Sequence, residues 1–126
     1  MAHILFLEPN TVLAQTYARA LQATGHSVAC ATSAQSAIDA ADKQAPDLVI
    51  VELQLPAHGG IEFLHEFRSY PEWQHVPVVV NTVITPSKMV PVAEALARDL
   101  GVTTICYKPQ TSLQELLNIT AQALGA

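Results

Sequence analysis

The sequence predicts a single α/β domain built on a parallel β-sheet, with helices covering both faces of the sheet. Short apolar segments alternate along the chain with longer amphipathic segments, an order typical of consecutive βαβ units. The segments at 48–51 and 76–80 are almost continuously apolar, so both faces of these strands must be covered. The length of 126 residues, half of them hydrophobic, suits one domain over residues 1–126.

The first half of the chain is predicted to form three strands with a helix between each pair. We expect strands at 3–7, 26–31 and 47–52, and helices at 11–25 and 33–45. Gly25 is placed to stop the first helix, and Ser33 to cap the second. The side chains predicted to face the core are Val12, Leu13, Tyr17, Ala20, Leu21 and Thr24 in the first helix, and Ala37, Ile38 and Ala41 in the second.

The second half repeats this plan. Helices are expected at 60–70 and 111–124, and strands at 76–82 and 102–107, with a further helix that ends near Leu100. Thr111 and Gln114 have the T-x-x-Q spacing of a capping box. One face of the last helix is predicted to consist of Leu113, Leu116, Leu117, Thr120 and Leu124. Trp73 is expected to cover a helix end, and the alternative is an exposed anchor for a partner.

The segment between residues 82 and 100 allows two interpretations. Because proline is tolerated in the first turn of a helix but costs about 3 kcal/mol inside one, the main helix is expected to begin near Pro91. A short turn capped by Thr85 would precede it. One interpretation is an irregular loop, and the other is a remodelled surface that exposes Met89 and Val90 to a partner.

Composition and charge argue against several classes of protein. The net charge is −5 and the six basic residues are scattered, so no basic stripe is available to bind nucleic acid. No apolar run reaches the roughly 20 residues that cross a bilayer, and the first residues lack the basic start of a signal peptide. We therefore expect a cytoplasmic protein with no membrane association.

The cysteines and histidines are not spaced as metal ligands. Cys30 and Cys106 lie in apolar, strand-like segments without a C-x-x-C pattern, so both are expected to be buried, inert thiols. His58, His65 and His75 lack the spacing of a zinc site and are expected on the surface. His58 follows Glu52 in a loop, from which it could modulate a nearby crevice.

Four polar residues stand at the predicted ends of strands. They are Glu8, Glu52, Thr82 and Lys108, which follow or end the first, third, fourth and fifth strands. Ligands of open parallel sheets bind outside the carboxyl ends of the strands. We therefore expect two carboxylates, a hydroxyl and an ammonium to meet in one crevice.

These strand ends resemble a known family. The segments "ILFLEPN", "PDLVIVELQLP..GG", "VPVVVNT" and "YKP" are similar, in order and spacing, to the response-regulator receiver domain of two-component signalling. The resemblance covers nearly the whole chain. It implies a flavodoxin-like, doubly wound (βα)₅ three-layer sandwich whose five parallel strands have the order 2-1-3-4-5.

The resemblance also implies a role for each strand-end residue. Glu52 takes the place of the phospho-accepting Asp, Thr82 that of the switch hydroxyl, and Lys108 that of the family's lysine. Glu8 and Pro9 occupy the position of the acidic pair, so one Mg²⁺ ligand is replaced by a residue without a side-chain oxygen. Because Mg²⁺ requires near-ideal octahedral coordination by oxygen, its binding is expected to be weak or absent, and no other cofactor is expected.

Three further residues align with the switch of the family. Ile105 occupies the position at which many receivers have an aromatic residue, and strand alternation is taken to point Tyr107 the other way. The bond before Pro109 is commonly cis in the family, so Pro109 is a candidate for a cis peptide bond. Thr82 itself is either a retained switch hydroxyl or only a residue that favours a strand end.

Glu52 and Lys108 also allow two interpretations. Either Glu52 permanently replaces a phosphorylated Asp, or the two residues form a simple ion pair. A phosphoryl group carries about −1.5 to −2 charges and three acceptor oxygens, so any mimicry is partial.

The main hypothesis is an atypical receiver, not an enzyme, that binds another signalling protein or an output domain without Asp phosphorylation. It would use the face formed by the last two helices and the fifth strand, with a homodimer as a possible state. One alternative is a receiver phosphorylated by a histidine kinase through an unusual route. The other is a flavodoxin-like small-molecule-binding domain, although no G-x-G-x-x-G, Walker loop or nucleophile elbow is present.

Overall fold

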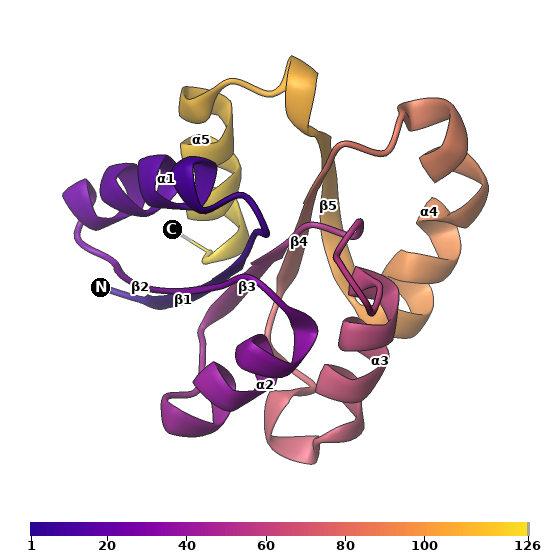
Figure 1. Ribbon diagram of the computed structural model, residues 1–126, viewed down its shortest axis with the longest axis horizontal. Coiled ribbons are helices and arrows are strands. Elements are labelled where there is room, and N and C mark those ends of the chain that lie inside the picture. Colours follow the sequence, from indigo (N-terminus) through magenta and orange to yellow (C-terminus); the bar gives the residue numbers. More distant parts are fainter. Residues whose placement is uncertain (126) are drawn as a thin grey trace.

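The computed structural model describes residues 1–125 and shows a parallel sheet of five strands between two layers of helices (Figure 1). The strands are β1 (His3–Leu7), β2 (Ser27–Ala31), β3 (Leu48–Val51), β4 (Val78–Thr82) and β5 (Val102–Tyr107). Every neighbouring pair is parallel, and the order is β2-β1-β3-β4-β5. This confirms the predicted order and the flavodoxin-like fold.

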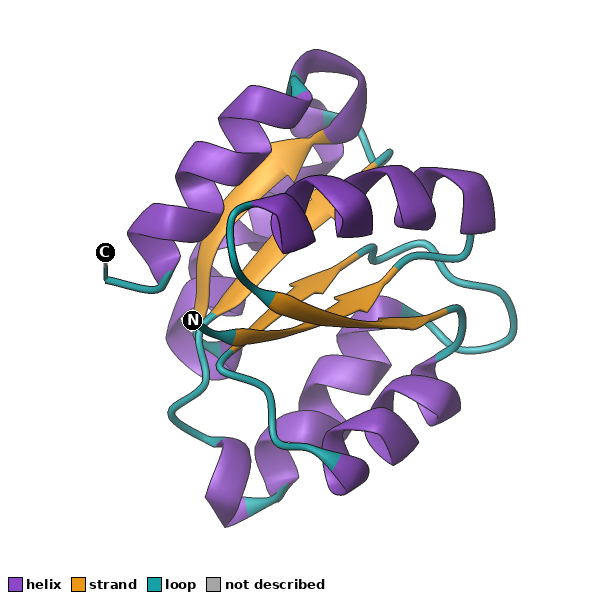
Figure 2. Cartoon of the chain, turned by 90° about the vertical axis from the view of Figure 1, so that its left-hand side faces the viewer, coloured by secondary structure: helices purple, strands orange, loops and turns teal. Residues whose placement is uncertain are grey.

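Helices cover both faces of the sheet, as the apolar strands require. They are α1 (Thr11–Ala23), α2 (Ala34–Lys43), α3 (Gly60–Ser69), α4 (Pro86–Leu100) and α5 (Leu113–Ala123), with short 3₁₀ helices η1 (Pro71–Trp73) and η2 (Lys108–Gln110). Helices α1 and α5 lie on one face and α2, α3 and α4 on the other (Figures 1 and 2).

The core consists of one apolar layer on each side of the sheet. The layer beneath α1 and α5 contains Tyr17, Leu21 and Leu116, and the layer beneath α2, α3 and α4 contains Phe63 and Phe67. Strand β3 lies in the middle of the sheet, and all four of its side chains are completely buried. Burying such a side chain contributes about 1.5 to 3 kcal/mol, so β3 firmly fixes the position of Glu52, the residue that follows it.

The helix boundaries agree with the sequence at two of three capping positions. Gly25 follows α1 with a φ of 98°, and the Ser33 side chain accepts a hydrogen bond from the Ser36 backbone at the start of α2. The capping box predicted for Thr111 is wrong by one residue, because Ser112 and Glu115 form it. Thr111 instead donates its hydroxyl hydrogen to the Tyr107 carbonyl and closes η2.

The inward faces of the helices agree only in part with the prediction, because Val12, Thr24 and Leu113 were expected to face the core and all three are exposed. Ala37, Ile38 and Ala41 are buried in α2, and Leu116 and Thr120 are buried in α5. Val12 was expected in the core of α1, but 74% of it is exposed. The face of α1 that meets the sheet runs through Ala14, Tyr17, Ala18 and Leu21, and Val12 lies outside this stripe in the first turn.

Helix α4 begins at Pro86, five residues before the predicted start, and is continuous through Pro91. Pro86 occupies the first turn, where proline is favourable, and Pro91 lies on the exposed side of the helix. The first turn is held by hydrogen bonds from the backbones of Lys88 and Met89 to the Thr85 carbonyl. The irregular-loop interpretation is therefore wrong. The alternative that exposes both Met89 and Val90 is wrong for Met89, which is buried, whereas Val90 is 73% exposed.

The remaining predictions about single residues had mixed outcomes. Cys106 is buried, but Cys30 is exposed because β2 is an edge strand of the sheet. Trp73 is buried and stacks on Phe67 at the end of α3, so the exposed-anchor alternative is wrong. In residues 1–125 no helix is both long and apolar enough to cross a membrane.

We predict that Gly60→Ala destabilises the fold, because an added Cβ would lie 2.6 Å from the Glu52 carbonyl oxygen and from the Leu53 Cα. We expect a loss of about 1 to 3 kcal/mol in the free energy of unfolding, measured by urea denaturation. The neighbouring Gly59→Ala is the matched control, since its Cβ would meet nothing closer than 3.9 Å. Equal stability of the two variants would contradict the prediction.

Candidate functional site

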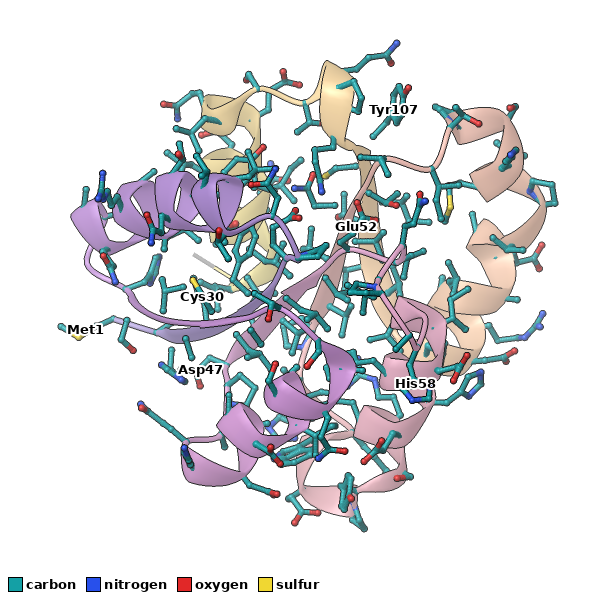
Figure 3. The ribbon with its side chains drawn as sticks, viewed as in Figure 1. Met1, Cys30, Asp47, Glu52, His58 and Tyr107 are labelled. Carbon is teal, nitrogen blue, oxygen red and sulfur yellow. The ribbon has the colours of Figure 1, made fainter. Side chains whose placement is uncertain are left out.

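The four strand-end residues meet at the carboxyl edge of the sheet. Glu8 follows β1, Glu52 follows β3, Thr82 ends β4 and Lys108 follows β5. Glu8 and Glu52 are 2% exposed, and Thr82 is completely buried. Figure 3 shows Glu52 where the ends of the strands converge. The structure therefore brings together all four residues that the sequence singled out.

The Lys108 ammonium lies between the two carboxylates. Its Nζ atom is 2.5 Å from Glu8 Oε1 and 2.9 Å from Glu52 Oε1. The Lys108 side chain is only 11% exposed, so both ion pairs are largely shielded from water. Such shielding strengthens each attraction, and it also makes loss of either partner costly. We call the three residues Glu8, Glu52 and Lys108 the ionic brace.

The Glu52 carboxylate accepts four hydrogen bonds. Oε1 accepts from Lys108 and from the Val83 backbone N–H, which is 3.0 Å away. Oε2 accepts from the Thr82 hydroxyl and from the Gln54 backbone N–H, also 3.0 Å away. A carboxylate has about four lone-pair positions, so all the acceptor capacity of Glu52 is used within the protein.

Glu8 is held by its own loop, whereas Pro9 contributes no ligand. Glu8 Oε2 accepts a hydrogen bond from the Asn10 backbone N–H, and Asn10 then caps α1. Pro9 is half-buried between them and has no polar side-chain atom. The brace therefore contains two carboxylates and one ammonium, with a net charge of −1. In residues 1–125 no cluster of three or more His, Cys, Asp or Glu side chains has the geometry of a metal site.

The brace shifts the ionisation of two of its members. Burial by itself would raise the pKa of Glu52, but hydrogen bonds from Thr82, Lys108 and Gln54, together with the Lys108 charge, lower it below the ordinary value. Burial would lower the pKa of Lys108, but its bonds to Glu8 and Glu52 and their charges raise it. Both groups are therefore held in their charged forms at neutral pH.

An apolar groove lies beside the brace, between α4 and β5. It is lined by Ile84, Pro86, Met89, Val90, Ala93, Ile105 and Tyr107. Ile105 and Tyr107 therefore lie on the same face of β5, and the expectation that Tyr107 points the other way is wrong. Residues two apart on a strand share a face, so alternation in fact predicts what is seen. Figure 3 shows Tyr107 at the end of β5 on the side of α4.

Other sequence-predicted residues lie outside the brace. The bond between Lys108 and Pro109 is trans, because residues 1–125 contain no cis peptide bond, and Pro109 fits the first turn of η2 in that form. His65 and His75 are exposed, as predicted. His58 is also exposed; its Nδ1 atom lies 3.4 Å from Glu62 Oε2, and the side chain lies away from Glu52 (Figure 3).

Sequence reasoning missed two members of the site. The backbone N–H groups of Gln54 and Val83 donate hydrogen bonds to Glu52, and no side-chain pattern could reveal them. It also missed Asn81, a buried residue of β4 whose side-chain nitrogen and oxygen both lack a hydrogen-bond partner in residues 1–125. Strand alternation could have found Asn81, because a polar residue within an otherwise apolar strand is unusual.

A doubly wound sheet whose strand ends bring together two acids, a hydroxyl and a lysine defines the receiver class of signalling domains. The model of the response regulator receiver domain family matches residues 4–121 of this chain. The chain therefore belongs to the response regulator receiver family.

Individual relatives support the same assignment. The chain is 35% identical over 79 residues to the probable transcriptional regulatory protein TcrX of Mycobacterium tuberculosis, and 34% identical over 80 residues to the KDP operon transcriptional regulatory protein KdpE of Escherichia coli. These matches cover 63% and 64% of this chain but only 33% and 34% of the relatives, so the chain spans about a third of their length.

A solved structure shows the same fold. The crystal structure of a putative response regulator from Chloroflexus aurantiacus superposes with a TM-score of 0.84 at 23% identity. The superposition covers 99% of this chain and 98% of that chain.

We predict that the brace makes stability depend on pH at both ends of the scale. The Glu52 contribution is complete above the ordinary pKa of about 4.5 and is lost as the pH falls through its lower folded value. The Lys108 contribution is complete below about 10.5 and is lost as the pH rises through its higher folded value.

Urea denaturation across a pH series measures this dependence. Below pH 4.5 the free energy of unfolding should fall less steeply for Glu52→Gln than for the wild type. Glu94→Gln, an exposed carboxylate of α4, should keep the wild-type slope. If the free energy of unfolding fell equally steeply below pH 4.5 for the wild type and for Glu52→Gln, the prediction would be refuted.

Proposed function

We propose that this receiver signals by binding another protein and does not depend on phosphorylation of Glu52. The observation that carries the proposal is the saturated Glu52 carboxylate, whose two oxygens accept four hydrogen bonds from the protein. To attack a phosphoryl donor or to bind a metal ion, an oxygen needs a free lone pair. Glu52 has none available without breaking the brace.

Loss of metal coordination supports the same conclusion. The family's acidic pair is reduced here to Glu8, since Pro9 has no side-chain oxygen. The Lys108 ammonium lies between the two remaining carboxylates and neutralises half of their charge. We therefore propose that Mg²⁺ binds weakly or not at all and that no other cofactor is needed. Phosphoryl transfer relies on a metal to neutralise developing charge, so the domain would have no catalytic activity of its own.

The brace also suggests which signalling state is populated. In the family, the residues that correspond to Thr82 and Lys108 change their contacts when the phosphoryl group is present. In this chain both already bind Glu52, which carries a single negative charge. We propose that Glu52 partly replaces a phosphorylated Asp and holds Thr82 and Lys108 permanently in that arrangement. The domain would then be a fixed binding module rather than a switch.

The partner would dock on the face formed by α4, β5 and α5. This face carries the apolar groove beside Tyr107, and Val90 is exposed at its rim. A second signalling protein, an output domain or a second copy of the chain would bind there through an apolar contact. Two unpaired thiols, Cys30 and Cys106, are in keeping with the reducing cytoplasm, where we place the protein.

We predict that the wild-type protein gains no phosphoryl group from acetyl phosphate and Mg²⁺, as measured by intact-mass spectrometry. The double variant Pro9→Asp with Glu52→Asp restores the acidic pair and shortens the acceptor, so it should gain a Mg²⁺-dependent phosphoryl adduct. Glu52→Asp alone separates the two effects, since the acidic pair is still incomplete. A Mg²⁺-dependent adduct on the wild type that is lost in Glu52→Gln would overturn the proposal.

We predict that Val90→Glu abolishes partner binding, because it places a charge in the rim of the groove. Val12→Glu is the matched control, since Val12 on α1 is 74% exposed and Val90 is 73% exposed. In affinity purification from the native host, the wild type and Val12→Glu should retain the same partner proteins. Val90→Glu should not retain them. Sedimentation velocity tests for a homodimer in the same three proteins. Identical behaviour of the two variants would exclude this face.

A further inference from the structure

Asn81 lies in the same row of the sheet as the two carboxylates of the ionic brace. In the sheet register, Leu7 pairs with Val51 and Val51 pairs with Val80. One residue further along each strand, Glu8, Glu52 and Asn81 are side by side, and Asn81 pairs with Cys106 on β5. Side chains in one row of a parallel sheet leave it on the same face. Asn81 therefore stands next to Glu52, on the face covered by α1 and α5.

The Asn81 side chain has unused hydrogen-bonding capacity in a buried place. It is 2% exposed, and neither Nδ2 nor Oδ1 has a partner in the described part of the chain. Its neighbour on the same face of β4 is Val79, in the apolar layer. Leaving a buried amide unpaired is destabilising, so a polar partner at this position is strongly favoured.

The Lys108 side chain must cross β4 to reach its two partners. Lys108 follows β5, whereas Glu52 follows β3, and β4 lies between these strands. The residue of β4 on this face and in this row is Asn81. An ammonium has three N–H donors, and Glu8 and Glu52 use two of them. The third has no acceptor among residues 1–125.

We propose that Asn81 binds an internal water molecule that also accepts the third N–H of Lys108, and that Asn81 is thereby a positioning residue of the brace. This inference rests on the proposed function, because it explains how Lys108 is kept between the two carboxylates. A buried water needs two to four polar partners. Asn81 Oδ1, Asn81 Nδ2 and Lys108 Nζ supply three. An apolar side chain at position 81 would remove this ordered acceptor from the third Lys108 donor.

Nuclear magnetic resonance tests the water and the position of Lys108 together. The side-chain amide protons of Asn81 should show a cross-peak to a long-lived water molecule. The Lys108 ammonium signal should be visible in the wild type through slow exchange with solvent, and it should be lost in Asn81→Leu. Asn81→Ser, which can still hold a water molecule, should keep it. Thr120→Val removes the hydroxyl of Thr120 on α5, the other buried polar side chain without a hydrogen-bond partner in residues 1–125, and should also leave the signal unchanged.

A double-mutant cycle gives an independent measure. The effects of Asn81→Leu and Lys108→Met on the folding equilibrium constant should not simply multiply. The double variant should differ from the product of the two single effects by at least about threefold. The effects of Thr120→Val and Lys108→Met should combine without such a difference. If Asn81→Leu does not fold, Asn81→Val replaces it in both experiments.

An unchanged Lys108 signal in Asn81→Leu, an additive cycle, or the absence of a water contact at Asn81 would each overturn the inference. None of these outcomes affects the phosphorylation experiment. A phosphoryl adduct on the wild-type protein would overturn the proposed function instead, so the two failures are distinguishable.

Discussion

The Lys108 ammonium between Glu8 and Glu52 is the contact on which the arrangement of the site depends. Without it, two buried carboxylates on neighbouring strands would repel each other, and a shielded charge would remain unpaired. Lys108 lies 100 residues from Glu8 and 56 from Glu52 along the chain. The ion pairs therefore connect the ends of β1 and β3 to the segment that follows β5. They also place the negative charge of Glu52 where Thr82 and the Val83 backbone can reach it.

The substitutions that set this chain apart from an ordinary receiver support one another. We attribute the proposed weakness of Mg²⁺ binding to Pro9, which has no side-chain oxygen atom at the position of the second acid. The Glu52 carboxylate accepts hydrogen bonds from Lys108, Thr82 and two backbone N–H groups. The Lys108 ammonium is the cation that lies between the two carboxylates. The proposal of a binding module that does not need phosphoryl transfer is based on these contacts.

Particular residues show where sequence reasoning succeeds and where it fails. Short apolar segments located all five strands, and the most continuous of them, in β3 and β4, are buried on both faces of the sheet. The capping box of α5 was misplaced by one residue, since Thr111 and Ser112 are both capable caps and the choice depends on η2. The predicted start of α4 is five residues too late, because the cost of a proline inside a helix argues against a helix that continues through Pro91. In the structure Pro91 lies on the exposed side of the helix, and Met89 is buried on the side that faces the core. Ile105 and Tyr107 are two residues apart on β5, so strand alternation places both side chains on one face, as the groove beside α4 shows.

The sequence by itself determined the fold class, the order of the elements and the four residues at the strand ends, because periodicity, caps and strand-end chemistry are local. Only the tertiary structure decided how those residues are bonded. The four hydrogen bonds to Glu52 come from residues of three separate segments, and two of them come from backbone groups that have no sequence signature. The place of Asn81 depends on register across four strands. Contacts of this kind arise from the packing of distant strands, which no local pattern encodes.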